Sequence, residues 1–179
     1  MSDNTSVATR IIEILDQLGI GQTHLGAWGS ADWGPLISEF PDRFVSMTLP
    51  FAALRLGTPD SMRHPILAFA SDQGTGPINS ARLLERAPHA QLNVFEGYPA
   101  PLWNDLIVDH ADRIETDMRA LFAEHPIDSV DLDGQEGQVG DIRYRAQGNG
   151  PPVIVLPIGL VPSQWGPVTA ALARDHCVI

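Results

Sequence analysis

The sequence predicts an α/β protein whose mostly parallel sheet is flanked by helices. Short apolar runs alternate with amphipathic helical segments along its 179 residues. The runs are continuously apolar, which is typical of strands that are buried on both faces of a parallel sheet. With 44% hydrophobic and 18% charged residues, the chain also has the composition of an ordinary globular domain.

The first two helices are predicted from periodicity and from breaker residues. Over 8–18, apolar residues recur on one helical face, and Gly19 suits the end of that helix. The polar residues at 4–6 provide candidate N-caps. A second helix is predicted over 30–39, where Pro35 limits it to a first turn or a break.

Strands and helices keep alternating up to Pro126. The longest helix runs over about 104–124, because Ile107, Ile114 and Leu121 lie on one apolar stripe and Pro126 ends it. The other elements predicted in this part are strands at 23–27, 44–49, 66–70 and 92–95, and a helix at 79–87.

Residues 127–140 change character and predict an acidic linker. Their carboxylates, on Asp128, Asp131, Asp133 and Glu136, are separated by glycine, serine and a few apolar residues. The pattern resembles a fragment of a calcium loop, but the ligand set is incomplete. A solvated linker is therefore the favoured interpretation.

The segment 141–179 predicts further strands. Alternation over 142–146 indicates a half-buried strand, and the apolar run at 153–156 indicates a buried one. Ser163 can cap a helix between them and the end of the chain. Residues 176–179 begin another strand, and because an apolar strand stops on the last residue we expect a partial chain.

Charge and cysteine content exclude several classes of function. The formal net charge is −11 and all eleven basic residues are arginine, so the chain lacks the basic surface that binds nucleic acid or anionic membranes. Neither a membrane span nor a signal peptide is recognisable, and we expect a cytoplasmic protein. Cys177 is the sole cysteine, which excludes an internal disulfide and a cysteine metal cluster.

The segment 23–31 resembles the nucleophile elbow of α/β-hydrolases, but the nucleophile is missing. In that family a serine stands at the centre of G-x-S-x-G, on a tight turn between a strand and a helix. Here Ala27 or Gly29 takes the centre, depending on the register, with Trp28 between them. Ser30 comes one step late, and centring the motif on it puts large neighbours where small residues belong. Ser30 is therefore a better helix N-cap than a nucleophile.

Most of the chain resembles the α/β-hydrolase superfamily with the order of elements changed. Residues 8–126 resemble its C-terminal half: 64–72 is similar to the strand that carries the catalytic acid, and 87–97 to the approach to the histidine loop. Residues 141–179 resemble its N-terminal strands, with 150–159 similar to the strand and oxyanion loop. Two explanations are open. The last segment completes the same sheet in a permuted domain, or one hydrolase-like unit ends and another begins.

The resemblance implies a catalytic triad, yet its members are displaced or missing. Asp72 stands just after a strand, where the family has its acid, and it also suits a loop residue that binds backbone N–H groups. Tyr98 and Pro99 stand where the histidine is expected. His110 is the candidate for a displaced base, while its position on the longest helix equally suits a packing residue.

Two further parts of the family's site are altered. The oxyanion-like loop of Ile158, Gly159 and Leu160 keeps a glycine that lets backbone N–H groups approach a ligand, but Pro157 lacks an N–H. Only residues 50–65 separate two of the strands, so no lid domain is expected. No cofactor is implied, and the histidines lack metal-ligand spacing with a carboxylate.

The favoured interpretation is an α/β-hydrolase-fold domain that has lost catalysis and serves as a binding or interaction module, or as a relic within a larger enzyme. One alternative is an active, esterase-type serine hydrolase that uses Ser30, Asp72 and His110. Another is the leading part of an S-adenosylmethionine-dependent methyltransferase fusion, since the segment from Tyr144 onward resembles such bacterial proteins. The partners compatible with these hypotheses are a small-molecule ester or acyl ligand and a second copy of the chain, with no nucleic acid and no membrane.

Overall fold

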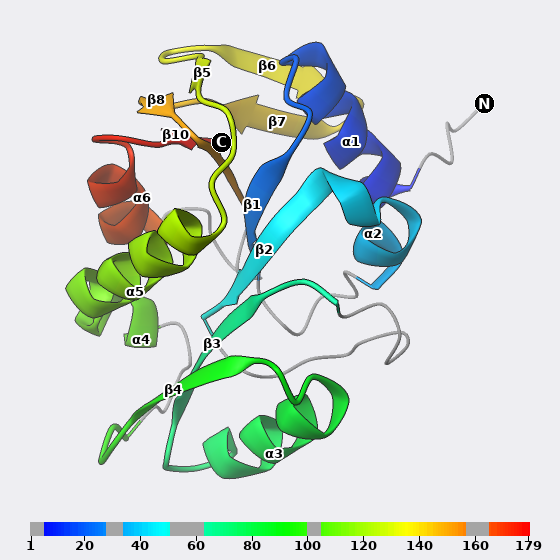
Figure 1. Ribbon diagram of the computed structural model, residues 1–179. Coiled ribbons are helices and arrows are strands. Elements are labelled where there is room, and N and C mark those ends of the chain that lie inside the picture. Colours follow the sequence, from blue (N-terminus) through cyan, green and yellow to red (C-terminus); the bar gives the residue numbers. More distant parts are fainter. Residues whose placement is uncertain (1–5, 28–33, 51–62, 100–104, 157–164) are drawn as a thin grey trace.

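The computed structural model describes residues 6–27, 34–50, 63–99, 105–156 and 165–179. Within these residues, six strands form one sheet in the order β10-β9-β1-β2-β3-β4, and every neighbouring pair is parallel (Figure 1). The predicted α/β class with a mostly parallel sheet is therefore confirmed. The strands of this sheet are β1 (Thr23–Gly26), β2 (Phe44–Leu49), β3 (Ile66–Ser71), β4 (Gln91–Phe95), β9 (Pro152–Val155) and β10 (Cys177–Val178).

Helices cover both faces of the sheet (Figure 1). One face carries α1 to α3 and the other carries α4 to α6. Alternate residues of β3 point to opposite faces, because Ile66 and Ala68 belong to one buried cluster and Leu67 and Phe69 to the other. The helices are α1 (Val7–Gln17), α2 (Gly34–Glu39), α3 (Gly76–Arg86), α4 (Asp105–Asp109), α5 (Ala111–Glu124) and α6 (Gly166–Leu172), with a 3-10 turn at Pro41–Arg43.

A strand from the N-terminal part of the chain and one from its C-terminal part are neighbours within the sheet. β9 pairs with β1 so that Leu25 lies opposite Ile154, and the Thr23 hydroxyl donates to the carbonyl of Pro152 at 2.9 Å. β10 then extends the sheet beyond β9. Elements from the N-terminal and C-terminal parts of the sequence therefore share one sheet and one pair of cores.

The stretch 127–140, predicted as an acidic linker, contains structure. It includes β5 (Val130–Asp131), which pairs with β8 (Asn149–Gly150), and β6 (Glu136–Val139), which forms an antiparallel hairpin with β7 (Ile142–Arg145). Leu132 and Val139 are buried. A few apolar residues scattered among carboxylates and glycines make a weak pattern, which explains why the sequence indicated a linker.

A glycine-rich loop closes the outer edge of β10. Gln147 and Val178 exchange two backbone hydrogen bonds of 2.8 and 2.9 Å, so this edge is paired at Val178. Gly148 and Gly150, with φ of +74° and +132°, let the loop approach the turn before β10. A Cβ on Gly150 would lie 2.1 Å from the carbonyl oxygen of Asp175, a distance that no side chain tolerates.

Several helix boundaries differ from the expected ones. The helix predicted as continuous over 104–124 is two helices, because His110 has φ of −121° and ψ of 27° between α4 and α5. α3 begins at Gly76 rather than 79, since Pro77 in the first turn needs no N–H partner. Ser6 is the N-cap of α1, and its hydroxyl accepts from the Thr9 N–H. Ser163, expected to cap a helix, lies outside the described residues.

Candidate functional site

Asp72 follows β3 at the carboxyl end of the sheet, where ligand sites of α/β proteins gather. Its exposed carboxylate accepts a hydrogen bond of 2.9 Å from the backbone N–H of Gly97 and one of 3.1 Å from the Gln73 amide. Beside it, the Ser71 hydroxyl donates to the carbonyl of Tyr98 at 2.5 Å. These contacts fasten the loop after β4 to the end of β3.

The loop after β4 is built by glycine and tyrosine. Gly97 has φ of +67°, a conformation that glycine adopts without strain, and this turns its N–H toward Asp72. Tyr98 reaches away to α4, where its hydroxyl donates to the Asp109 carboxylate at 2.7 Å. The position at which the family resemblance implies a histidine therefore serves to anchor α4.

His110 lies at the junction of α4 and α5, against the same loop. Its ring stacks on Phe95 at 4.1 Å and meets the ring of Tyr98 edge-on at 4.9 Å. Its Nε2 is buried and has no hydrogen-bond partner. Arg113 lies over the Phe95 ring at 5.0 Å, and these residues line a cavity of about 370 Å³ together with Pro99.

The structure brings Asp72 and His110 to the same loop without joining them. Asp72 binds Gly97, and His110 packs on Phe95 and Tyr98. Within the described residues no hydrogen bond links the carboxylate of Asp72 to the imidazole of His110. The orienting contact that a triad needs is thus not made between these two groups.

The rest of the predicted site lies almost wholly outside the described residues. This holds for Ser30, for Trp28 and Gly29 of the elbow, for Ile158, Gly159 and Leu160 of the oxyanion-like loop, and for 51–62 in the place of a lid. Ala27 is described: its side chain is buried, and its N–H donates to the carbonyl of Thr48 at 3.0 Å, which continues the sheet.

A buried histidine lies on the sheet face beneath α5. His24 Nδ1 and Ser46 Oγ are hydrogen-bonded at 2.8 Å, and the imidazole stacks on Phe122 at 4.1 Å. Burial, and to a smaller extent the charges of His176 and His125, lower the pKa of His24 to about 3. His24 is therefore neutral at neutral pH, and its full burial leaves no route for a substrate.

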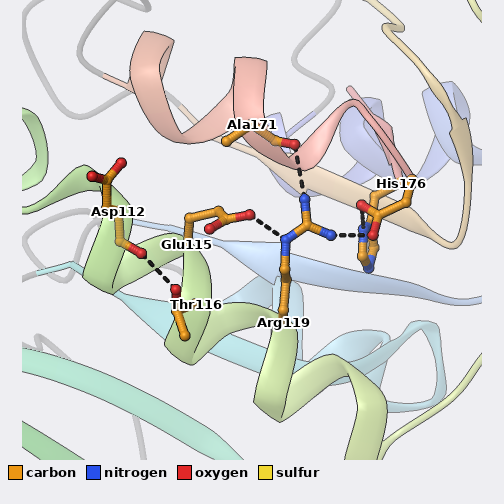
Figure 2. Close-up of polar contacts among 7 residues, drawn as sticks. Asp112, Glu115, Thr116, Arg119, Ala171 and His176 are labelled. Atoms are coloured by element: carbon orange, nitrogen blue, oxygen red, sulfur yellow. Dashed lines mark hydrogen bonds and ion pairs between the residues drawn. The ribbon is translucent and has the colours of Figure 1, made fainter.

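An ion-pair cluster joins α5 to the turn before β10 (Figure 2). The Arg119 guanidinium pairs with Glu115 on its own helix and with Asp175, and it donates to the carbonyl of Ala171 at 2.8 Å. Asp175 also pairs with the His176 Nδ1 at 2.7 Å. The hydrogen bond from Arg119 holds the pKa of Asp175 below its usual range, and the same bond raises the pKa of Arg119. We call Arg119, Asp175 and His176 the clasp.

The clasp could not be predicted from the sequence. Only the Glu115–Arg119 spacing, one helical turn, was visible in the sequence. Asp175 lies 56 residues from Arg119, so only the folded chain brings them together. Cys177 follows the clasp and is buried; burial, and then the carboxylates of Asp133 and Asp131, raise its pKa to about 11, so the thiol is not ionised at neutral pH.

The part of the chain that the structure describes has neither a membrane-spanning helix nor a group of side chains that could hold a metal ion. None of its helices is long and apolar enough to cross a membrane. No group of three or more histidine, cysteine, aspartate or glutamate side chains is arranged there to hold a metal ion.

The fold is thus an α/β sheet of parallel strands, with Asp72 at the end of β3 and the loop after β4 beside it. Among solved structures, the chain is similar to a protein described as a "predicted CIB-like hydrolase" from Thermoplasma acidophilum, with 16% sequence identity and a TM-score of 0.48. The match covers 64% of this chain and 57% of that one, so it spans less than two thirds of that protein. No protein-family model and no curated protein matches the chain.

Proposed function

We propose that this chain is an α/β-hydrolase-fold domain that has lost serine-hydrolase chemistry and acts as a binding module. One observation carries the proposal: the carboxylate in the place of the catalytic acid binds the backbone of Gly97, in the loop where the base is expected. A triad acid must instead orient a histidine. Asp72 therefore has a structural role that accounts for its position without catalysis.

The state of His110 supports the same proposal. A general base needs one ring nitrogen held by an acid and the other directed at the nucleophile. In His110 the ring is packed against Phe95 and Tyr98, and its buried Nε2 has no partner. At the elbow, the sequence has Ala27 or Gly29 in place of the serine. Acid, base and nucleophile thus depart from the triad together.

The arrangement of strands supports the permuted-domain explanation of the sequence. β9 and β10 come from the segment that resembles the N-terminal strands of the family, and they lie beside β1 in one sheet. We therefore propose that 8–126 and 141–179 form one domain. The cavity of about 370 Å³ beside His110 is large enough for a small ligand, and an ester or acyl compound remains our proposal for its class.

An active esterase that uses Ser30, Asp72 and His110 is the competing function. A fluorophosphonate probe and a panel of p-nitrophenyl esters separate the two, with Ser30→Ala as the test variant and Ser129→Ala, an exposed serine outside the predicted site, as its control. We expect no labelling and no turnover above the buffer rate. Labelling that disappears in Ser30→Ala and persists in Ser129→Ala would establish the esterase and overturn the proposal.

A further inference from the structure

β4 forms one edge of the main sheet, at the opposite end from β10 (Figure 1). Within the described residues it pairs with β3 on one side and with no strand on the other. The carbonyl of Phe95 accepts from the N–H of Asp72, which follows β3, so the backbone groups of Phe95 are turned toward β3. These directions alternate along a strand, and the N–H and C=O groups of Leu92 and Val94 are therefore turned to the free edge.

β4 lacks the features that protect exposed strand edges. Such edges commonly carry lysine, proline or an inward-pointing charge. The sequence of β4 is Gln-Leu-Asn-Val-Phe, with no charged residue and no proline. Leu92 packs against the core on the α3 side, and Val94 lies on the same face of the strand with 38% of its surface exposed. An uncharged edge with an exposed apolar side chain is suited to pairing with a further strand.

α3 extends this apolar surface beyond the strand. The buried residues of α3 are Gly76, Ser80 and Leu83. Pro77, Ala81 and Leu84 are exposed, and they form a stripe about a quarter of a turn away from the buried face. Both the α-helix and the β3–α3–β4 connection are right-handed, so this stripe is turned toward the free edge of β4. We call Leu92 and Val94, together with this stripe, the edge patch.

We propose that the edge patch binds the edge patch of a second copy of this chain, with the two β4 strands antiparallel around a twofold axis at Asn93. Leu92 then lies opposite Val94 of the second copy, and the two residues exchange both of their backbone hydrogen bonds. The outward groups of both copies are thus matched in one register. None of the triad candidates belongs to the edge patch, so this pairing does not depend on the loss of catalysis.

The distribution of charge favours a second copy as the partner. The formal net charge is −11, so two copies repel each other except where their contact surface is free of like charges. The edge patch holds no charged residue. Glu96, which follows β4, lies opposite Ala90 of the second copy and beside its His89, so no carboxylates face each other at the ends of the paired strands.

The stripe on α3 is also complementary to itself. The twofold axis places the two α3 helices side by side and antiparallel on the same face of the joined sheet. Pro77 and Leu84 lie on either side of Ala81, near the middle of α3, so Leu84 of one copy meets Pro77 of the other. Ala81 is small and lets the two helices approach closely. The contact therefore buries apolar surface in addition to pairing the strands.

Sedimentation velocity at micromolar to submillimolar concentrations, combined with hydrogen exchange, tests the proposal. We expect a dimer at high concentration that dissociates on dilution. The backbone N–H groups of Leu92 and Val94 should exchange more slowly in the dimer than in the monomer, because only pairing across the free edge covers them. A chain that stays monomeric over this range would overturn the proposal, and so would a dimer in which these two N–H groups exchange as fast as in the monomer.

Two exposed valines provide a matched pair of variants. Val94→Lys adds a like charge to both sides of the contact and should raise the dissociation constant of the dimer by at least about tenfold. Val108→Lys, at a 52% exposed valine on α4, should leave it unchanged. Leu84→Lys on α3 should weaken the dimer as well, and circular dichroism shows whether each variant is folded. A dimer that is as stable in Val94→Lys and Leu84→Lys as in the wild type would refute this surface.

Asn93→Cys tests the register of the pairing. Residues on the twofold axis form a non-hydrogen-bonded pair with Cα atoms about 4.5 Å apart, a separation that a disulfide spans. Mild oxidation should therefore link Asn93→Cys into a covalent dimer and leave Val108→Cys unlinked. Cys177 is buried and should not react in either variant. A noncovalent dimer of Asn93→Cys that oxidation fails to link would place the contact elsewhere, whatever the outcome of the fluorophosphonate test.

Discussion

Two regions of this molecule use their ionisable groups in opposite ways. Beneath α5, His24 is fully buried and the clasp ties α5 to the turn before β10. At the loops that follow β3 and β4, Asp72 is exposed and accepts a hydrogen bond from a backbone N–H, and His110 packs between aromatic rings. The strongest pKa shift therefore belongs to the packing of the fold, and not to the residues that the family resemblance marks as catalytic. A perturbed pKa indicates a reactive site only where a substrate can reach the group.

A side chain added at Gly150, which packs against the backbone of Asp175, should have the largest effect on stability. Gly150→Ala places a Cβ 2.1 Å from the Asp175 carbonyl oxygen, so either the loop or the turn before β10 must move. We expect a loss of about 3 kcal/mol in the free energy of unfolding, measured by urea denaturation. Gly134→Ala, also at positive φ but with open space around it, should lose only about 1 kcal/mol. Equal losses would show that the turn does not constrain the fold.

Acid should lower the free energy of unfolding through His24, which is buried beneath α5. The pKa of His24 falls from its ordinary 6.5 to about 3 on folding, so the unfolded chain binds the extra proton between these values and stability falls as the pH drops below 6.5. At pH 5 the loss from this group is about 2 kcal/mol. Unfolding free energies measured from pH 8 to pH 5 should show it.

A variant that removes both hydrogen-bonding partners isolates this contribution. In His24→Leu with Ser46→Ala neither partner of this hydrogen bond is left unpaired, and the acid loss between pH 6.5 and pH 5 should shrink. An unchanged pH profile would mean that other groups cause the acid sensitivity. Asp175, whose pKa is lowered, weakens the fold only at still lower pH, as it takes up its proton.

Breaking the clasp itself should cost less. Arg119→Gln removes the pairings with Glu115 and Asp175, but 26% of this side chain is exposed and water screens the charges. We expect a loss of about 1.5 kcal/mol by urea denaturation, because two ion pairs and the bond to Ala171 act together. Arg113→Gln, on the same helix but 56% exposed, should change stability by less than about 0.5 kcal/mol. If the two variants lost the same amount, the clasp would have no special weight.

A substitution of Asp72, in the loop after β3, should have the smallest effect on stability. Asp72→Asn keeps an acceptor for the Gly97 N–H but loses its charge, so we expect a change of about 0.5–1 kcal/mol. Asp128→Asn, an exposed carboxylate elsewhere, should be neutral. A stability change confined to Asp72→Asn fits its structural role. A loss of ester turnover in Asp72→Asn without any change in stability would instead assign it to catalysis.

Local sequence patterns predicted most of the elements of the main sheet. β2 lies at the predicted 44–49, and β1, β3, β4 and β9 agree within one residue at each end, because continuous apolar runs mark buried parallel strands. Helix ends were harder to predict. No glycine or proline marks the break at His110 in the sequence, so the apolar stripe through α4 and α5 looked continuous.

The sequence alone determined that this is an acidic chain of the α/β class with buried parallel strands. Periodicity and composition are local properties, so they can be recognised without knowing which distant residues a segment contacts. Only the tertiary structure decided that β9 lies beside β1, that Arg119 meets Asp175, and that Asp72 holds Gly97 rather than His110. Each of these contacts joins residues far apart in the chain, and their geometry depends on how the helices pack on the sheet.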